Sequence, residues 1–180
     1  MRTSAFEPCI PTRGTKVPAG PDWLHEIKQD GHRLIVQRED KRVRLFTRNG
    51  HDWSDRYPLI REAALRNRNN SFVIDGEAVL LGVDGISDFD GLHSRKHDDE
   101  VQFYAFDCLV SDGEDVRKVP LTMRKANLSR LLARRVDGNR TRRDRPGSVS
   151  EGLRVWLRRL GFKASRSTIS RRSSETLDQK

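Results

Sequence analysis

A lysine beside an Asp-Gly turn is the feature of this sequence that points most directly to chemistry. Residues 26–33 read Glu-Ile-Lys-Gln-Asp-Gly-His-Arg. On an extended strand Glu26 and Lys28 point to the same face, and a turn at Asp30 and Gly31 allows Arg33 to come back toward the lysine. The neutral amine of a lysine is a nucleophile, and a nearby arginine or metal ion favours that neutral form. Lys28 is therefore the candidate nucleophile of this chain.

Three more motifs follow the lysine in order along the chain. They are Thr-Arg-Asn-Gly at 47–50, Phe-Val-Ile-Asp-Gly-Glu at 72–77 and Phe-Tyr-Ala-Phe-Asp-Cys-Leu at 103–109. With the lysine motif, this series resembles the adenylation (nucleotidyltransferase) domain of ATP-dependent DNA ligases, most closely the bacterial ligase D type. The resemblance runs from about residue 6 to about residue 135 and covers motifs I, Ia, III and IIIa of that family. Guanylyltransferases and RNA ligases share the Lys-x-Asp-Gly pattern and are less similar.

The resemblance implies a reaction in three steps. The lysine that matches Lys28 attacks the α-phosphate of ATP, pyrophosphate leaves, and the lysyl-adenylate passes AMP to a 5′-phosphate at a DNA break, where the 3′-hydroxyl displaces it. Mg²⁺ or Mn²⁺ is expected, held through phosphate oxygens and one or two carboxylates. The implied setting is DNA repair and recombination in the bacterial cytoplasm, at the nucleoid. DNA ends or nicks are the implied partners, and an end-binding bridging protein is a further one by family analogy.

The resemblance also assigns roles to five residues around the lysine. Arg33 and Arg48 would hold the ribose and the phosphates, because a planar guanidinium binds phosphate through two parallel hydrogen bonds. Glu77 would contact the ribose hydroxyl or a metal-bound water, which makes it the candidate metal ligand. Phe106 would stack on adenine, since an aromatic ring suits a purine. Glu26 lies where the family places a residue near the adenine edge.

Each of these residues also has an ordinary structural explanation. Lys28 alone would be a solvated strand lysine, and Phe106 would serve the packing that any apolar strand needs. Glu77 and Arg48 would be solvated surface residues. Asp75, within the third motif, is expected to shape a turn or to orient a neighbour rather than to take part in chemistry.

Hydrophobic periodicity predicts the elements that position these motifs. Strands are expected at 24–28, 33–38, 42–47, 71–75, 77–83 and 101–110, and helices at 55–66 and 121–135. In the second helix the core-facing residues are expected to be Met123, Leu128, Leu131 and Leu132. Runs of strands with helices packed on them indicate an α+β fold with mainly antiparallel sheets. The resemblance adds that this fold is the nucleotidyltransferase-like (ATP-grasp-like) fold of DNA ligases and mRNA capping enzymes, in incomplete form.

The charge of the chain is concentrated in its last quarter. Of the net charge of +9, residues 136–180 carry +7, with 12 Lys and Arg against 5 Asp and Glu. We therefore expect an extended lead-in over 1–20, a partial adenylation domain over 21–135, and a basic, disordered tail over 136–180. Only two cysteines occur and no long apolar run or signal peptide opens the chain, so a soluble protein of a reducing compartment, without a membrane partner, is expected.

The tail begins where the family's motifs IV and V, Glu-Gly-x-Val-x-Lys and Lys-x-Lys, should follow. The only similar stretch in frame is Glu-Gly-Leu-Arg-Val-Trp at 151–156, which lacks the required lysine. With suitable codons, an alternative reading frame over 153–159 encodes Leu-Glu-Gly-Leu-Val-Ala-Lys. The hypothesis is a truncated or frameshifted ligase without motifs IV and V and the OB-fold domain. Two alternatives stay open: an impaired remnant that binds nucleotide or nucleic acid without sealing, and a protein that binds nucleic acid mainly through its tail.

Overall fold

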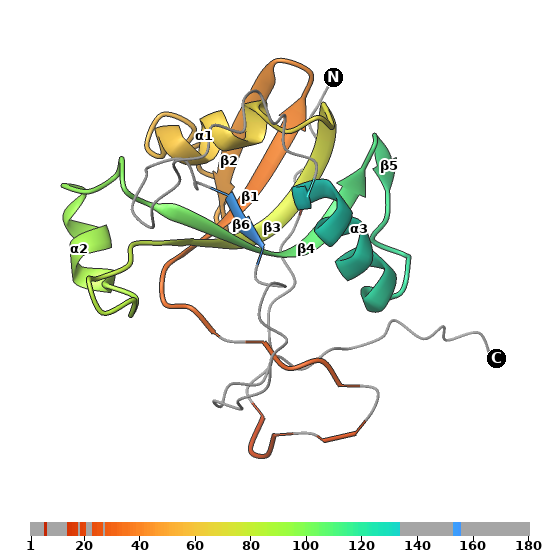
Figure 1. The fold of residues 1–180 in the computed structure, drawn as a ribbon, viewed down its shortest axis with the longest axis horizontal. Coiled ribbons are helices and arrows are strands. Elements are labelled where there is room, and N and C mark those ends of the chain that lie inside the picture. Colours follow the sequence, from red (N-terminus) through yellow and green to blue (C-terminus); the bar gives the residue numbers. More distant parts are fainter. Residues whose placement is uncertain are drawn as a thin grey trace, which may run out of the picture. The chain divides into compact units, whose positions relative to one another are not determined.

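The structure is a computed structural model and describes residues 6, 14–17, 19–20, 23–26 and 28–133, together with the backbone of residues 153–155. The chain divides into two compact units. One comprises Met1–Pro8 and Gln29–Leu160, and the other comprises Cys9–Lys28 and Gly161–Lys180. The helices and strands belong to the first of these units (Figure 1).

One sheet organises the first unit. Its strands are β1 (His32–Glu39), β2 (Arg42–Thr47), β3 (Ser71–Val79), β4 (Gln102–Ser111), β5 (Glu114–Asp115) and β6 (Leu153–Val155). The first five lie in the order β2-β1-β3-β4-β5, and every neighbouring pair is antiparallel. Asp40, in the turn between β1 and β2, takes the left-handed conformation with φ 51° that a two-residue hairpin turn favours. The predicted α+β class with antiparallel pairing is confirmed.

Three helices accompany the sheet in the described part of the chain: α1 (Pro58–Leu65), α2 (Phe89–Ser94) and α3 (Leu121–Ala133). Proline opens α1, where its fixed φ suits the first helical turn and its missing N–H costs no hydrogen bond. At the start of α2, the side chain of Asp88 accepts a hydrogen bond from the backbone N–H of Gly91, 2.8 Å away. None of the helices in this part is long and apolar enough to span a membrane.

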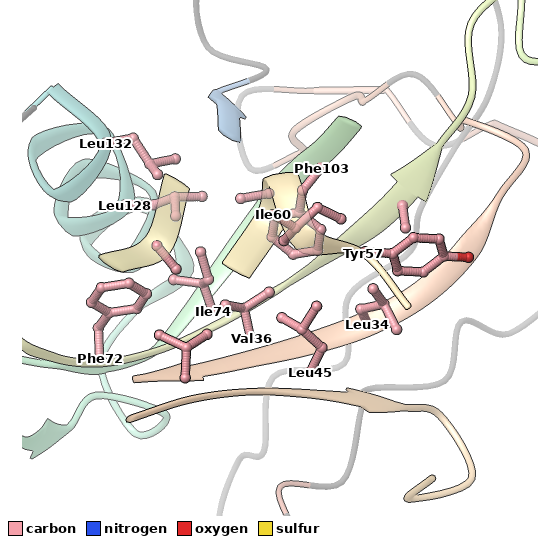
Figure 2. Close-up of a cluster of buried hydrophobic side chains, with 14 of the residues drawn as sticks. Leu34, Val36, Leu45, Tyr57, Ile60, Phe72, Ile74, Phe103, Leu128 and Leu132 are labelled. Atoms are coloured by element: carbon pink, nitrogen blue, oxygen red, sulfur yellow. The ribbon is translucent and has the colours of Figure 1, made fainter. Parts of the chain in front are cut away.

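The two faces of the sheet differ in how they are covered. One face packs against α1 and α3 and forms the main hydrophobic core, with side chains of alternating strand residues pointing toward the helices (Figure 2). Cys108 is fully buried in this core, and burial raises the pKa of its thiol to about 12, so it packs as an apolar side chain. The opposite face holds a smaller cluster around Ile35, Val73 and Leu109. This second face also carries polar side chains of β1 and β3.

Several elements differ from the sequence-based expectation. β3 runs without a break through Gly76, where the sequence predicted a gap between two strands. A Cβ at this position would lie 2.4 Å from the ring of Phe103, so the glycine is needed for close packing and does not form a turn. α2 occupies a stretch expected to be loop. Met123 was placed in the core by helical spacing, yet it is 56% exposed, since α3 packs through Leu128 and the residues one turn later. No strand forms at 24–26 or at 28, the described residues of the first predicted strand.

A short strand lies in the segment expected to be disordered. β6 pairs in parallel with β4, from Phe103 to Ala105. The outer edge of β4 is available there because β5 pairs only with Val110 and Ser111, and unpaired edge groups of a strand favour a further partner. The strand at Leu153–Val155 thus lies within the segment for which disorder is expected. The other residues of 134–180 lie outside the described part of the chain, and the division at 1–20, 21–135 and 136–180 stays a prediction.

Candidate functional site

A row of polar side chains crosses the face of the sheet opposite the helices. Arg33 on β1 is paired with Glu77 on β3, and Glu77 is paired with Tyr104 on β4. Residues directly opposite each other in neighbouring strands share one face, and the neighbours Leu34, Ala78 and Phe103 point into the main core. The register therefore places a guanidinium, a carboxylate and a phenol side by side on the second face.

Phe106 joins this row through a bulge in β4. Ala105 pairs with Gly76 and Asp107 pairs with Asp75, so Phe106 has no partner residue in β3. An extra residue of this kind bends the strand and redirects a side chain. The ring of Phe106 comes to lie under the guanidinium of Arg33, whose Cζ is 5.2 Å from the ring centroid. The structure thus brings together three of the predicted residues: Arg33, Glu77 and Phe106.

The guanidinium of Arg33 is fixed by a buried carboxylate. Its Nε donates to Oδ1 of Asp75 at 3.0 Å and its Nη2 to Oδ2 at 2.6 Å. The side chain of Asp75 is 3% exposed and that of Arg33 is 18% exposed. Burial raises the pKa of Asp75, and the hydrogen bonds from Arg33 act in the opposite direction. The arginine is consequently held in one orientation, with its guanidinium over the ring of Phe106.

The Asp-Gly turn of the lysine motif lies against the same end of β3. A Cβ at Gly31 would be 2.2 Å from the carbonyl oxygen of Ala78 and 3.1 Å from Cγ of Glu77. Only glycine permits this approach of two backbones. Gln29 is held nearby, because its Oε1 accepts a hydrogen bond from Oγ of Ser87 at 2.9 Å. Gly31 thus lies against Glu77, while the side chain of Gln29 is bonded to Ser87.

The remaining predicted residues are placed as follows. Arg48 is exposed in the turn after β2, next to Thr47, which pairs with Leu34, so the turn lies at the same end of the sheet as Arg33. Glu26 and Lys28 belong to the unit formed by Cys9–Lys28 and Gly161–Lys180, and their part in the site stays a prediction. Sequence reasoning missed Tyr104. Its signal was the alternation in Phe-Tyr-Ala-Phe at 103–106, which puts the tyrosine and the second phenylalanine on one face.

A protein-only metal site is absent from the described residues, among which no three or more His, Cys, Asp or Glu side chains gather to hold an ion. Both oxygens of Asp75 are engaged by Arg33. Glu77 lies on this face opposite Arg33, and one carboxylate with substrate phosphates is the arrangement that suits Mg²⁺.

The family described as "ATP dependent DNA ligase domain" matches residues 12–156. The Multifunctional non-homologous end joining protein LigD of Pseudomonas aeruginosa is 38% identical over 118 residues, which cover 64% of this chain and 14% of that protein. The corresponding LigD protein of Mycobacterium tuberculosis is 38% identical over 107 residues, 59% of this chain and 14% of the relative.

A solved structure of a DNA ligase is similar to this chain in its fold. It is a mycobacterial DNA ligase D complexed with ATP and MES, with a TM-score of 0.64 and 32% identity, covering 72% of this chain and 43% of the solved one. The chain spans only a small part of its curated relatives, 14% of the length of each LigD protein named above. The family predicted from the four motifs is confirmed: the chain belongs to the ATP-dependent DNA ligase domain family.

Proposed function

We propose that this chain binds ATP on the second face of the sheet and transfers its AMP to Lys28, as the adenylation step of DNA strand joining. The observation that carries the proposal is the convergence of Arg33, Glu77 and Phe106, which come from three strands and lie on one face. A base, a ribose and a phosphate chain need an aromatic ring, a hydrogen-bond acceptor and a cation in that order of contact. The family membership of residues 12–156 supports the same substrate.

Each residue has a distinct task in this proposal. Phe106 stacks on adenine, and Glu77 accepts a hydrogen bond from a ribose hydroxyl. Arg33 and Arg48 bind phosphate oxygens, because both lie at the end of the sheet where β1 begins and β2 ends. Glu26 is assigned to the adenine edge by its place in the lysine motif.

Lys28 is the nucleophile of the proposed transfer. Its neutral Nζ attacks the α-phosphorus of ATP, a phosphorus–nitrogen bond forms, the bond to the bridging oxygen breaks, and pyrophosphate departs with that electron pair. The amine loses a proton to water. Lys28 lies three residues before Gly31, which packs against Glu77, and this closeness in the chain supports Lys28 as the nucleophile.

A divalent ion fits the donor set. As the alternative to its contact with the ribose, Glu77 would hold Mg²⁺, through a bound water, together with phosphate oxygens of the substrate. When bound, the ion neutralises charge on the phosphates. By the names of the relatives, DNA ends in end joining are the proposed acceptors, and a bridging protein that binds those ends is a proposed partner.

The test is covalent labelling of the full chain. Incubation with ATP labelled at the α-phosphate and Mg²⁺ should attach AMP to Lys28, located by mass spectrometry of peptides. Lys28→Arg should abolish the label. The control is Lys118→Arg at an exposed lysine, which should label like the wild type. Label from GTP instead of ATP would indicate a capping-type activity, and no binding of ATP at millimolar concentration would overturn the proposal.

A second candidate function is ATP binding without transfer. It is favoured by residues 151–156, which lack the lysine that the family's motif IV places near the nucleotide's phosphates. Equilibrium titration with ATP separates the two functions. Binding that requires Phe106 but leaves no covalent AMP after prolonged incubation would support this second function over the first.

A further inference from the structure

The bulge that carries Phe106 lacks the support that a regular ladder gives. Because Phe106 has no partner in β3, the β3–β4 ladder is interrupted where the ring must be held. A side chain aimed by a bulge keeps its direction only if other groups fix the backbone around it. Those groups come from α3, the helix that follows β4 and β5 in the chain.

Arg124 on α3 holds the residue after the bulge. Its Nε donates to Oδ1 of Asp107 at 2.9 Å and its Nη2 to Oδ2 at 3.1 Å. The two side chains are 14% and 17% exposed. Asp107 in turn accepts the backbone N–H of Cys108 at 2.8 Å, and Nη1 of Arg124 donates to the carbonyl oxygen of Val119 at 2.8 Å. This carboxylate therefore connects the strand just past the bulge to the first turns of the helix.

Lys125, the next residue of α3, holds the bulged residue itself. Its Nζ donates to the backbone carbonyl oxygen of Phe106. This charge-assisted hydrogen bond holds the backbone at the residue that has no partner in β3. Adjacent residues of one helix thus bind the backbone of Phe106 and the side chain of Asp107, on the two sides of the peptide bond that joins them.

We propose that Arg124 and Lys125 are positioning residues that aim the ring of Phe106, and so set the contribution of the adenine base to nucleotide affinity. Neither residue needs to touch the nucleotide. The support of the Phe106 ring by α3 follows from the structure alone, whereas its effect on nucleotide affinity rests on the proposed function. Substitution at either position should release the bulge while the main core, built from other residues of α3, keeps the helix in place.

The first test needs no nucleotide. In the full chain, amide hydrogen exchange of Phe106 and Asp107 should speed up in Lys125→Met and Arg124→Lys, because each removes a bond that holds the bulge. Arg130→Met is the matched control, since Arg130 is exposed and bonds only within α3 among the contacts described, at Ala126 and Asn127. Lys125→Arg keeps a cationic donor at this position and should retain the slow exchange of the wild type. Equal exchange in Lys125→Met, Arg130→Met and the wild type would overturn the proposal.

The second test separates the base from the phosphates. Lys125→Met should weaken ATP binding about tenfold, which corresponds to about 1.4 kcal/mol, and should leave the affinity for inorganic triphosphate unchanged. In a Phe106→Leu background the same substitution should have no further effect on ATP affinity, because the ring through which it acts is gone. An equal loss for ATP and triphosphate, or an undiminished effect in the Phe106→Leu background, would show a general structural role and overturn the proposal.

The two tests also distinguish failure of this inference from failure of the proposed function. If the wild-type chain binds no ATP while the exchange results hold, the proposed function fails and the support of the bulge by α3 stands. If ATP binds and depends on Phe106 but not on Lys125 or Arg124, the proposed function stands and this inference fails.

Discussion

The guanidinium of Arg33 meets both carboxylate oxygens of Asp75 across neighbouring strands, at 3.0 and 2.6 Å, and lies over the ring of Phe106. A paired arginine at such a place serves two purposes. In the proposed function its charge would meet phosphate oxygens, and its direction is set by Asp75. Asp75 is thus a residue of the site that acts through its neighbour.

Replacement of Asp75 by asparagine should lower the free energy of unfolding by about 3 kcal/mol, because it leaves a largely buried guanidinium without its counter-charge. Chemical denaturation of the full chain measures this loss. Asp99→Asn, at an exposed carboxylate, is the matched control and should change stability by less than about 0.5 kcal/mol. An unchanged midpoint for the Asp75 variant would mean that the ion pair contributes nothing to the fold.

Removal of the ring at Phe106 should weaken ATP binding about tenfold, since base stacking on an aromatic side chain is worth about 1–3 kcal/mol. Phe106→Tyr keeps an aromatic ring and should bind nearly as the wild type does. Phe89→Leu makes the same change as Phe106→Leu at a phenylalanine on α2 and should leave ATP affinity intact. Isothermal titration with ATP measures all three, and equal affinities for wild type and Phe106→Leu would remove adenine stacking from the proposal.

The purified chain alone should seal a nicked duplex at a rate near background and should adenylate Lys28 slowly. Residues 151–156 lack the lysine that the family's motif IV supplies to the nucleotide's phosphates. Loss of one preorganised charge contact in phosphoryl transfer costs about 3 kcal/mol, a rate factor of about a hundred. Gel assays on a nicked substrate provide the measurement. Efficient sealing that disappears in Lys28→Ala would show that other cations of this chain replace the missing one.

Stability should fall as the pH drops below about 6.5, in part because of His32. Burial is the main cause that lowers the pKa of His32 below 6.5, and the nearby cations Arg56 and His93 act in the same direction. The unfolded chain therefore takes up this proton first, and the folded state loses stability until the pH reaches the lowered value. Below that pH, His32 is protonated in both the folded and the unfolded chain and no longer contributes to the change of unfolding free energy with pH.

Variants at two histidines test the assignment. His32→Gln should flatten the decline in unfolding free energy on the acid side of 6.5, although it also removes the hydrogen bond between Nδ1 of His32 and the hydroxyl of Tyr57, which is 3.0 Å long. His51→Gln, at an exposed position, should keep the wild-type slope. The same slope in both variants would assign the acid sensitivity to other groups.

Much of the fold followed from local patterns. Alternating residues predicted β1, β2 and β4 to within about two residues at each end, and the apolar spacing of 121–135 predicted α3. In each of these elements the hydrophobic residues recur with one clear spacing, that of a strand or that of a helix. Met123 shows the limit of the method, because spacing puts it near the apolar stripe while the tilt of a packed helix decides which edge of the stripe is covered.

The site depended more on tertiary contacts. The motif residues Arg33, Glu77 and Phe106 were identified from the sequence, but their convergence required the register of three strands, which no local pattern fixes. Lys125 and Arg124 were invisible for the same reason: on a helix rich in cations, nothing in the sequence separates a lysine that binds a strand carbonyl from one in water.

The parallel pairing of β6 with β4 has a consequence for how the domain folds. A parallel neighbour is reached only by a crossover, and here the connection from β4 to β6 includes α3. The pairing of Phe103 with Leu153 closes a long loop, whereas the pairing of β1 with β2 closes a loop of only two residues. High contact order delays such a pairing. The hairpin should therefore form early, and the parallel edge should be among the last parts to assemble and the first to open.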